Sequence, residues 1–271
     1  MCSSIVHLME WIQIISLGLI QGVTEFLPVS SSGHLILISI ILGWQDQGLL
    51  MDIVAHAGSL IAVMIYFRRE IRSMLQSVGA PASSHNQADK HLLASIMLAT
   101  LPIMLAGVWL ADLIELYLRD HTVIAISSML FAIFLLYADR TAHCQRDEYA
   151  LSYGAALLIG CAQIFALVPG ASRAGVTMTA ALMLGCNKAA AARFSFLLSI
   201  PTILAAIVYK SMQLSFSHSQ LDWSAMIGVF FISGMVAYAC IKIFVKLVDH
   251  IGLVPFVIYR LVLGGCLLLI V

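Results

Sequence analysis

The chain has 271 residues, of which 61% are hydrophobic and only 10% are charged, and its mean hydropathy is +1.00. Soluble domains carry about 25% charged residues, so this composition excludes a soluble globular protein and indicates an all-α integral membrane protein with several spans. The formal net charge is zero, which offers no basic field to a nucleic acid. The six cysteines show no CxxC spacing, which argues against a disulfide framework or a cysteine metal cluster.

The first unusual stretch runs from Gln21 to His34, where an amide, a carboxylate, three hydroxyls and an imidazole interrupt an apolar region. Ionisable groups at membrane depth are costly and mark candidate functional sites. Gln21 and Glu25 are four residues apart, so both lie on one helical face, and Pro28 stops that helix. The three serines that follow offer N-caps for a second helix at 35–42, with His34 in its first turn. A helix N-terminus in this place would suit a phosphate.

Residues 5–24 are apolar but run straight into Glu25 and Pro28, and 35–42 is too short to span a bilayer, which takes about 20 residues. We therefore expect residues 5–45 to form a re-entrant helix–turn–helix that lines a cavity. The polar segment 68–91 is expected to be a surface connection. Full spans are expected at 52–67, 92–111, 122–138, 194–209, 223–241 and 254–271.

A second, shorter break follows in the other half of the chain. Gln163 leads to Pro169, a glycine-rich turn and then Ser172 and Arg173. Ser172 is expected to cap a helix at 176–186. Here too a proline, a turn and a capping serine come in succession, so the second break is expected to resemble the first.

The two breaks belong to an internal repeat. The matched pairs are Gln21 and Gln163, 142 positions apart; Pro28 and Pro169, 141 apart; Ser31 and Ser172, 141 apart; and Tyr66 and Tyr209, 143 apart. We predict a single membrane domain, 1–271, with a first repeat at 1–138 that contains the EFLPVSSSGH hairpin and a second repeat at 139–271 that contains the PGASRAGVT hairpin. The copies differ chemically, because Ala166 stands where the first copy has Glu25, and Arg173 occurs only in the second copy.

The distribution of Lys and Arg residues indicates how the second half of the chain crosses the membrane. If 150–168 spans the membrane, seven Lys and Arg residues lie on one side and five on the other. If 150–187 is a second re-entrant hairpin, the tally becomes ten against two, which the positive-inside rule favours. We therefore predict an inverted-topology repeat with six transmembrane helices, two re-entrant helical hairpins and both termini outside. Such repeats place their sites at the repeat interface.

The two motifs closely resemble the signature motifs of the bacterial undecaprenyl-diphosphate phosphatases of the bacitracin-resistance (BacA/UppP) type. The likeness extends to 193–201 and 255–260 and so covers essentially the whole chain. It implies an enzyme that hydrolyses undecaprenyl diphosphate to the monophosphate and phosphate, which recycles the lipid carrier for cell-wall synthesis and gives bacitracin resistance. It also implies a location in the bacterial inner membrane and dependence on a divalent cation, Mg²⁺ or Ca²⁺. Many members have Glu where this chain has Gln21, and Ser where it has Ala174.

Four residues are expected to be catalytic: Glu25, Ser31, His34 and Arg173. Glu25 would ligate the hard cation through its oxygens or, alternatively, would be protonated and bonded to the hairpin backbone. The nucleophile is left open between Ser31, His34 and water, with His34 as the general base in the first and last cases. The family pattern, and not the spacing, selects Ser31 over Ser30. Arg173 would bind phosphate with two parallel hydrogen bonds or form a salt bridge with Glu25 across the repeat interface.

A second set is expected to bind the substrate, or merely to cap helices and bond the backbone: Gln21, Ser30, Ser32, Ser172 and Thr177. Asp52 and His56 begin the next span at helical spacing. They either complete a metal site or mark the polar end of a membrane helix, and the second interpretation is favoured. Arg260 either extends to a membrane surface or pairs inside the bundle.

The expected partners are the lipid substrate and membrane lipids, without nucleic acid, and a homodimer is left open. The site would open toward the periplasmic face, because the first hairpin enters from that side. A transporter that flips polyprenyl phosphate is the alternative function, since an inverted repeat suits it equally well. A His–Ser–Glu–Arg cluster favours hydrolysis, because a carrier needs phosphate binding but no general base.

Overall fold

The computed structural model describes residues 2–270 except 32, 36–42, 45–47, 82, 119, 143–145 and 215–221. This part of the chain is helical and holds no β-strand beyond an isolated bridge between Arg146 and Cys186. Its elements are α1 (Cys2–Thr24), α3 (Leu49–Tyr66), α4 (Arg68–Ser77), α5 (Ser84–Tyr117), α6 (His121–Thr141), η1 (Glu148–Ala150), α7 (Tyr153–Gln163), η2 (Ile164–Leu167), α8 (Arg173–Met183), α9 (Lys188–Gln213), α10 (Trp223–Ile251) and α11 (Val254–Ile270).

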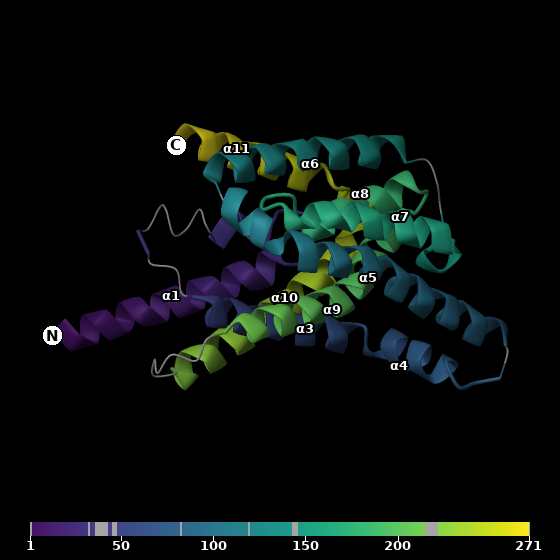
Figure 1. The fold of residues 1–271 in the computed structure, drawn as a ribbon, viewed down its shortest axis with the longest axis horizontal. Helices are drawn as coiled ribbons and strands as arrows, with labels where there is room; N and C mark the ends of the chain where they lie inside the picture. The colour runs from purple at the N-terminus through teal and green to yellow at the C-terminus, as the bar shows by residue number, and fades with distance from the viewer. Residues whose placement is uncertain are drawn as a thin grey trace.

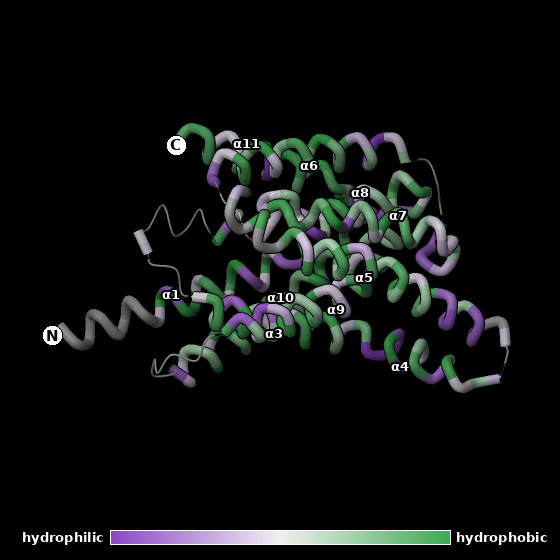
Figure 2. The backbone as a smooth tube through the Cα atoms, viewed as in Figure 1, coloured by the Kyte–Doolittle hydropathy of each residue, from purple (hydrophilic) through white to green (hydrophobic). Residues whose placement is uncertain are grey.

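Five helices are long and apolar enough to cross a membrane: α3, the Asn86–Leu110 part of α5, α6, α9 and α10. They confirm the all-α integral membrane class and cover five of the six expected spans. The sixth, expected at 254–271, is α11, which has 17 residues. Figure 2 shows hydrophobic residues over most of the helices, with hydrophilic residues gathered on α4 and the adjoining start of α5.

The segment 68–91 is not the plain surface connection that its polar composition predicts. It contains α4 and the beginning of α5, and these two helices pack against each other. α4 buries Met74 and Ser77, and Ser73 donates a hydrogen bond to the Asp89 carboxylate of α5. Ile71 and Met74 are three residues apart and pack into the core, which gives this otherwise charged helix a narrow inward face, whereas Leu75 is 62% exposed.

Both breaks interrupt helices where the sequence predicts it. α1 ends at Thr24, a turn covers 25–29, and the chain is helical again at Ser31; most of the expected helix 35–42 lies outside the described residues. In the second half, α7 ends at Gln163 and α8 begins at Arg173. Both α7 and α8 have 11 residues, or about 16 Å at 1.5 Å per residue, roughly half of what a bilayer requires. These lengths favour a re-entrant hairpin over a full span at 150–168.

α3 and α9 run antiparallel and carry ion pairs at both ends. Arg193, near the start of α9, places Nη2 3.0 Å from Glu70 Oε1 and Nε 2.5 Å from Glu148 Oε1. At the other end of the pair, Lys210 Nζ lies 3.9 Å from Asp52 Oδ2. Figure 1 shows α1 starting and α11 ending at one end of the molecule and α4 at the opposite end. The α4 end carries the three arginines of that helix, Arg68, Arg69 and Arg72.

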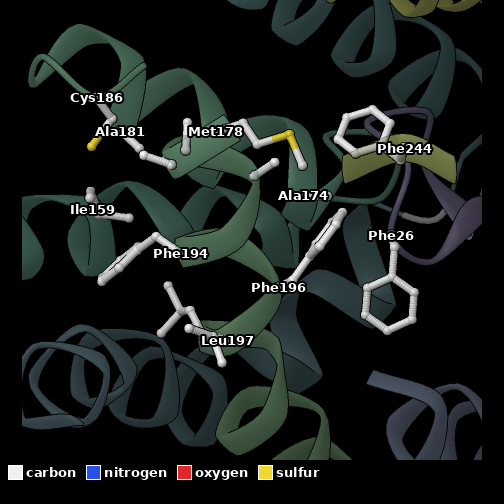
Figure 3. Packing of buried hydrophobic residues seen from close by; sticks show 14 of the residues in the cluster. Phe26, Ile159, Ala174, Met178, Ala181, Cys186, Phe194, Phe196, Leu197 and Phe244 are labelled. Atoms are coloured by element: carbon white, nitrogen blue, oxygen red, sulfur yellow. The ribbon is translucent and has the colours of Figure 1, made fainter. Parts of the chain in front are cut away.

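Aromatic packing fixes the first break against α9 and α10. The ring of Phe26 meets that of Phe196 edge to face, with centroids 5.5 Å apart, and Phe196 meets Phe244 at 5.7 Å. Figure 3 shows these three rings beside Ala174 and Met178 of α8. Because the side chains of the first break and of α8 share one core, the polar residues next to them are brought together.

Candidate active site

Glu25 is the centre of a polar cluster at the first break. Its Oε1 lies 2.8 Å from Arg173 Nη2. Its Oε2 accepts hydrogen bonds from Gln21 Nε2 at 3.0 Å and from Ser31 Oγ at 3.2 Å. The carboxylate is nearly buried, with 8% of the side chain exposed. Four of the residues predicted for the site therefore meet within hydrogen-bonding distance, and the expected pairing of Gln21 and Glu25 on one helical face is confirmed.

Arg173 connects the two repeats. Besides its contact with the Glu25 carboxylate, Nη2 donates to the Glu25 carbonyl oxygen and Nη1 to the Ser195 carbonyl oxygen, both at 3.4 Å. Its Cζ lies 5.8 Å from the centroid of the Phe26 ring. The salt bridge across the repeat interface, one of the two roles considered from the sequence, is therefore formed. It also holds the guanidinium at the first break, where a phosphate could replace the carboxylate.

His56 lies beside this cluster, a contact that neither interpretation of Asp52 and His56 predicted. Its Nδ1 lies 2.7 Å from the Asp52 carbonyl oxygen, so Nδ1 carries a proton, and its Nε2 lies 3.6 Å from Glu25 Oε2. Asp52 itself lies one turn away and pairs loosely with Lys210. An imidazole inside an apolar span was the available signal, but only the folded chain shows which carboxylate it faces.

Equivalent serines cap the helices that follow the two breaks. Ser30 and Ser172 have φ angles of 71° and 69°, a region that costs a non-glycine residue about 1–3 kcal/mol and is common at functional sites. Ser30 Oγ accepts from the Gly33 N–H at 3.4 Å, and Ser172 Oγ accepts from the Gly175 N–H at 3.2 Å. Both serines were expected to bind substrate or cap a helix, and the structure shows the capping role.

This geometry corrects the register of the repeat by one residue. Ser172 is equivalent to Ser30, 142 positions earlier, and not to Ser31 as the 141-residue offset suggested. Compared with the first break, the second has one residue fewer between its glutamine and its proline, and one residue more between the proline and the capping serine. Matching the prolines therefore shifted the alignment of the serines by one residue. The equivalent of Ser31 is therefore Arg173, and these two residues contact the two oxygens of the same carboxylate, that of Glu25.

His34 is held at the edge of the cluster. Its Nδ1 lies 2.7 Å from the Ser30 carbonyl oxygen and its Nε2 lies 2.5 Å from Tyr259 Oη. A carbonyl oxygen only accepts, so Nδ1 donates, and Nε2 of the neutral ring accepts from the tyrosine hydroxyl. The His34 and Tyr259 rings are also parallel to within 3°. Sequence reasoning missed Tyr259, which is 225 residues away.

Arg260, the next residue of α11, lies inside the bundle and not at a surface. It is fully buried, and its Nη2 donates to the Gly170 and Ala171 carbonyl oxygens, each at 2.9 Å. Its Nε donates to Ser128 Oγ at 3.4 Å. Arg260 thus holds the turn that leads into α8. One turn of α11 contacts both breaks, the first through Tyr259 and the second through Arg260.

Two further predicted residues act behind the cluster. Thr177 is fully buried, and its Oγ1 lies 2.9 Å from the Arg173 carbonyl oxygen and 2.7 Å from Ser195 Oγ, so it supports the first turn of α8. Gln21 is also fully buried. Its Oε1 has no hydrogen-bond partner among the described residues. Ser32, the remaining predicted residue, lies outside the described part.

The cluster offers two oxygen donors that fit a hard cation, Glu25 Oε2 and the unpartnered Gln21 Oε1. Over the residues that the structure describes, no group of three or more His, Cys, Asp and Glu side chains is placed to hold a metal ion. Mg²⁺ is commonly held by one or two carboxylates together with substrate phosphates. The donors here fit an ion that shares the oxygens of a diphosphate, and do not form a complete cage.

The chain is similar to known proteins over nearly its whole length. Residues 14–266 match the family model described as bacitracin resistance protein BacA. The chain is 49% identical to "Undecaprenyl-diphosphatase 1" of Pseudoalteromonas translucida (strain TAC 125) over 260 residues, which cover 94% of this chain and 97% of that protein. It is 47% identical to "Undecaprenyl-diphosphatase" of Hahella chejuensis (strain KCTC 2396) over 265 residues, which cover 96% and 98%.

Proposed function

Because the chain belongs to the bacitracin resistance protein BacA family, we propose that it is an undecaprenyl-diphosphate phosphatase, which releases one phosphate and returns the lipid carrier to cell-wall synthesis. The relatives named for this activity align with nearly the whole chain. The observation that carries the proposal is the chain of contacts from Arg173 through Glu25 to Ser31, at 2.8 and 3.2 Å. It joins a phosphate-binding cation, a base and a hydroxyl at one point.

Arg173 binds the terminal phosphate in this proposal. Arg173 is the first residue of α8, so its guanidinium lies at the N-terminus of that helix. The first N–H groups of a helix lack an acceptor within the helix, and the helix dipole there favours an anion. An arriving phosphate therefore replaces the Glu25 carboxylate on Arg173. The displaced carboxylate keeps its contacts with Gln21 and Ser31, so its Oε2 remains placed to accept the Ser31 proton.

Ser31 is the proposed nucleophile, because its hydroxyl already donates to Glu25 Oε2. As Oγ bonds to the terminal phosphorus, the hydroxyl proton passes to Glu25, and the bridging P–O bond breaks with its electron pair leaving on undecaprenyl phosphate. A water molecule then attacks the phosphoserine, and phosphate leaves as Ser31 recovers a proton from Glu25. General-base assistance of this kind contributes about 10²–10⁴ in rate.

Glu25 Oε2 and Gln21 Oε1 are the proposed protein ligands of Mg²⁺ or Ca²⁺. Such an ion, bound together with the diphosphate, would neutralise charge on the leaving phosphate.

Trapping the covalent intermediate tests this proposal. Purified protein mixed with undecaprenyl diphosphate labelled in its terminal phosphate and quenched in acid should retain label on Ser31. Ser31→Ala should carry no label and should turn over at least about a hundredfold more slowly. Ser30→Ala is the matched control, since it removes a capping hydroxyl from the neighbouring residue. Unlabelled wild-type protein with full turnover would show that water attacks, and label on His34 would make that residue the nucleophile.

Release of phosphate by the protein in detergent separates hydrolysis from transport, because micelles have no two sides. The protein is a multi-pass membrane protein, and we place it in the bacterial inner membrane with the site opening to the periplasm. Cysteine at Met212, near the end of α9, should then be labelled from outside the cell, and cysteine at Gln76 of α4 only from the cytoplasm. Labelling of both from one side would overturn this orientation.

A further inference from the structure

A pocket of about 490 Å³ lies next to the catalytic cluster, between α5, α9 and the second break. Its walls are mainly apolar. Met104 and Val108 contribute from α5, Ala205 and Ala206 from α9, and Leu167 from the second break. A pocket of this size and lining is typical of sites that enclose a small ligand or part of a larger one.

The inner end of the pocket adjoins the residues that hold the phosphate site. Pro169 forms part of the wall and stands three positions before Ser172. Thr202, another wall residue, donates to Gln163 Oε1 at 3.5 Å. The outer end is linked to the cluster as well, because the carbonyl oxygen of Asp52, which lines that end, accepts the proton of His56, and His56 faces Glu25. A molecule that leaves the cluster in this direction therefore passes into apolar surroundings.

The side of the pocket between α5 and α9 opens toward the bilayer. Met104 and Val108 are 46% and 69% exposed on the outer surface of these membrane-spanning helices. Each helix also contains a proline at the level of the inner end, Pro102 in α5 and Pro201 in α9. Proline removes a backbone donor and bends a helix. At Gly107 an added Cβ would meet nothing within 4 Å, so the wall has free space there.

The outer end of the pocket carries a loosely paired cation. Lys210 Nζ is 3.9 Å from the Asp52 carboxylate, and 39% of the lysine side chain is exposed. At the opposite end of α3 and α9, Arg193 is bound by two carboxylates within 3.0 Å. The outer pair is thus the weaker of the two, and it places a positive charge above an apolar opening, which suits an amphiphile with an anionic head group.

We propose that this pocket holds the isoprene units next to the diphosphate, and that the rest of the hydrocarbon chain leaves between α5 and α9 into the bilayer. The assignment rests on the proposed function, since it takes the lipid diphosphate as the substrate. An ordinary acyl chain gains little by moving from lipid into this pocket, because lipid tails are as apolar as its walls. Occupancy therefore depends on the diphosphate, which anchors one particular chain at the inner end.

Filling the pocket without disturbing the cluster tests the assignment. Gly107→Trp places an indole in the free space on the wall, and Leu105→Trp, on the lipid-exposed face of the same helix, is the matched control. Gly107→Trp should raise KM for undecaprenyl diphosphate about tenfold or more and change kcat little, since the lost contact is the same in the ground and transition states. Hydrolysis of methyl diphosphate, which has no isoprene unit, should be unchanged. Ala206→Phe with Leu204→Phe as its control repeats the test on α9.

A second measurement does not depend on turnover. Photolysis with a benzophenone-bearing geranyl phosphate should label peptides of α5 and α9 in the unaltered protein and in Leu105→Trp, and not in Gly107→Trp. Labelling of other helices, or labelling that Gly107→Trp leaves unchanged, would overturn the assignment. Should the unaltered protein release no phosphate from undecaprenyl diphosphate, the proposed function fails, and the labelling pattern still decides whether the pocket takes an isoprenoid chain.

Discussion

The two helix breaks in this protein share one backbone conformation but carry different chemical groups. Each has a buried glutamine, a serine with φ near 70° and a glycine whose N–H the serine caps, and the members of each pair are 142 residues apart. The first break supplies Glu25 and Ser31, which accept and donate a proton. The second supplies Arg173, which carries a permanent charge.

This difference gives the two breaks, similar in backbone, unlike chemical groups. A diphosphate needs a nucleophile and a base on one side of the terminal phosphorus and positive charge around its oxygens. Two identical breaks would have supplied either two carboxylates or two guanidinium groups, and like charges at this distance repel each other. The two breaks differ at the residue after the capping serine, which is Ser31 in the first break and Arg173 in the second.

Removing the charge of the first break should have the largest effect. Glu25→Gln keeps the shape of the side chain and removes the base, so we expect kcat to fall by about 10²–10⁴. Raising the substrate concentration should not restore it, because the lost interaction serves the chemical step. Steady-state kinetics on purified protein give the answer. A variant that recovers full turnover at high substrate would mean that Glu25 contributes to binding alone.

Changing the cation of the second break comes next. Arg173→Lys keeps the charge and loses the two parallel hydrogen bonds, so kcat/KM should fall at least about tenfold, or about 1.4 kcal/mol. Arg173→Ala should cost considerably more while the protein still folds in detergent. Near-normal kcat/KM in Arg173→Lys would remove the bidentate argument. Loss of folding in Arg173→Ala would instead assign the residue to the salt bridge with Glu25.

The equivalent glycines allow a direct comparison of the two breaks. An added Cβ at Gly175 would lie 2.8 Å from Arg260 Nη1, whose guanidinium is fixed by two carbonyl oxygens, whereas at Gly33 the nearest atom would be 3.5 Å away. We expect Gly175→Ala to lower the melting temperature by several degrees, an effect of about 1–3 kcal/mol from overpacking. Gly33→Ala should leave it nearly unchanged. Equal shifts in thermal unfolding would show that the breaks tolerate volume alike.

Restoring a second carboxylate to the first break should have the smallest effect. Gln21→Glu replaces a side chain that already contacts Glu25 Oε2 and whose Oε1 lacks a partner, and the cation proposed for this place would accept another charged oxygen. We expect kcat within a few-fold of the unaltered protein and tighter Mg²⁺ binding by titration calorimetry. Gln163→Glu is the control in the other repeat. Loss of turnover with normal metal binding in Gln21→Glu would contradict the role given to position 21.

The predictions that the structure confirmed rest on the spacing of residues close together in the sequence. The four-residue interval between Gln21 and Glu25, the prolines and the capping serines all act within one or two turns of helix, where geometry follows from sequence. The contacts that sequence could not give join distant segments. His56 reaches Glu25 only because α3 lies beside the first break, and Tyr259 reaches His34 from α11. The register error around Ser31 arose because the prolines were matched, and the capping serine stands two residues after Pro28 but three residues after Pro169.

The docking of α11 has a consequence for how the protein matures. Both breaks are translated and enter the membrane before α11 leaves the ribosome, and at that stage His34 lacks Tyr259 and the Gly170–Ala171 turn lacks Arg260. Unpaired carbonyl oxygens at membrane depth are unfavourable, so insertion of α11 completes both hairpins in one event. We therefore expect a chain truncated before Tyr259 to be inactive even with Glu25, Ser31 and Arg173 intact.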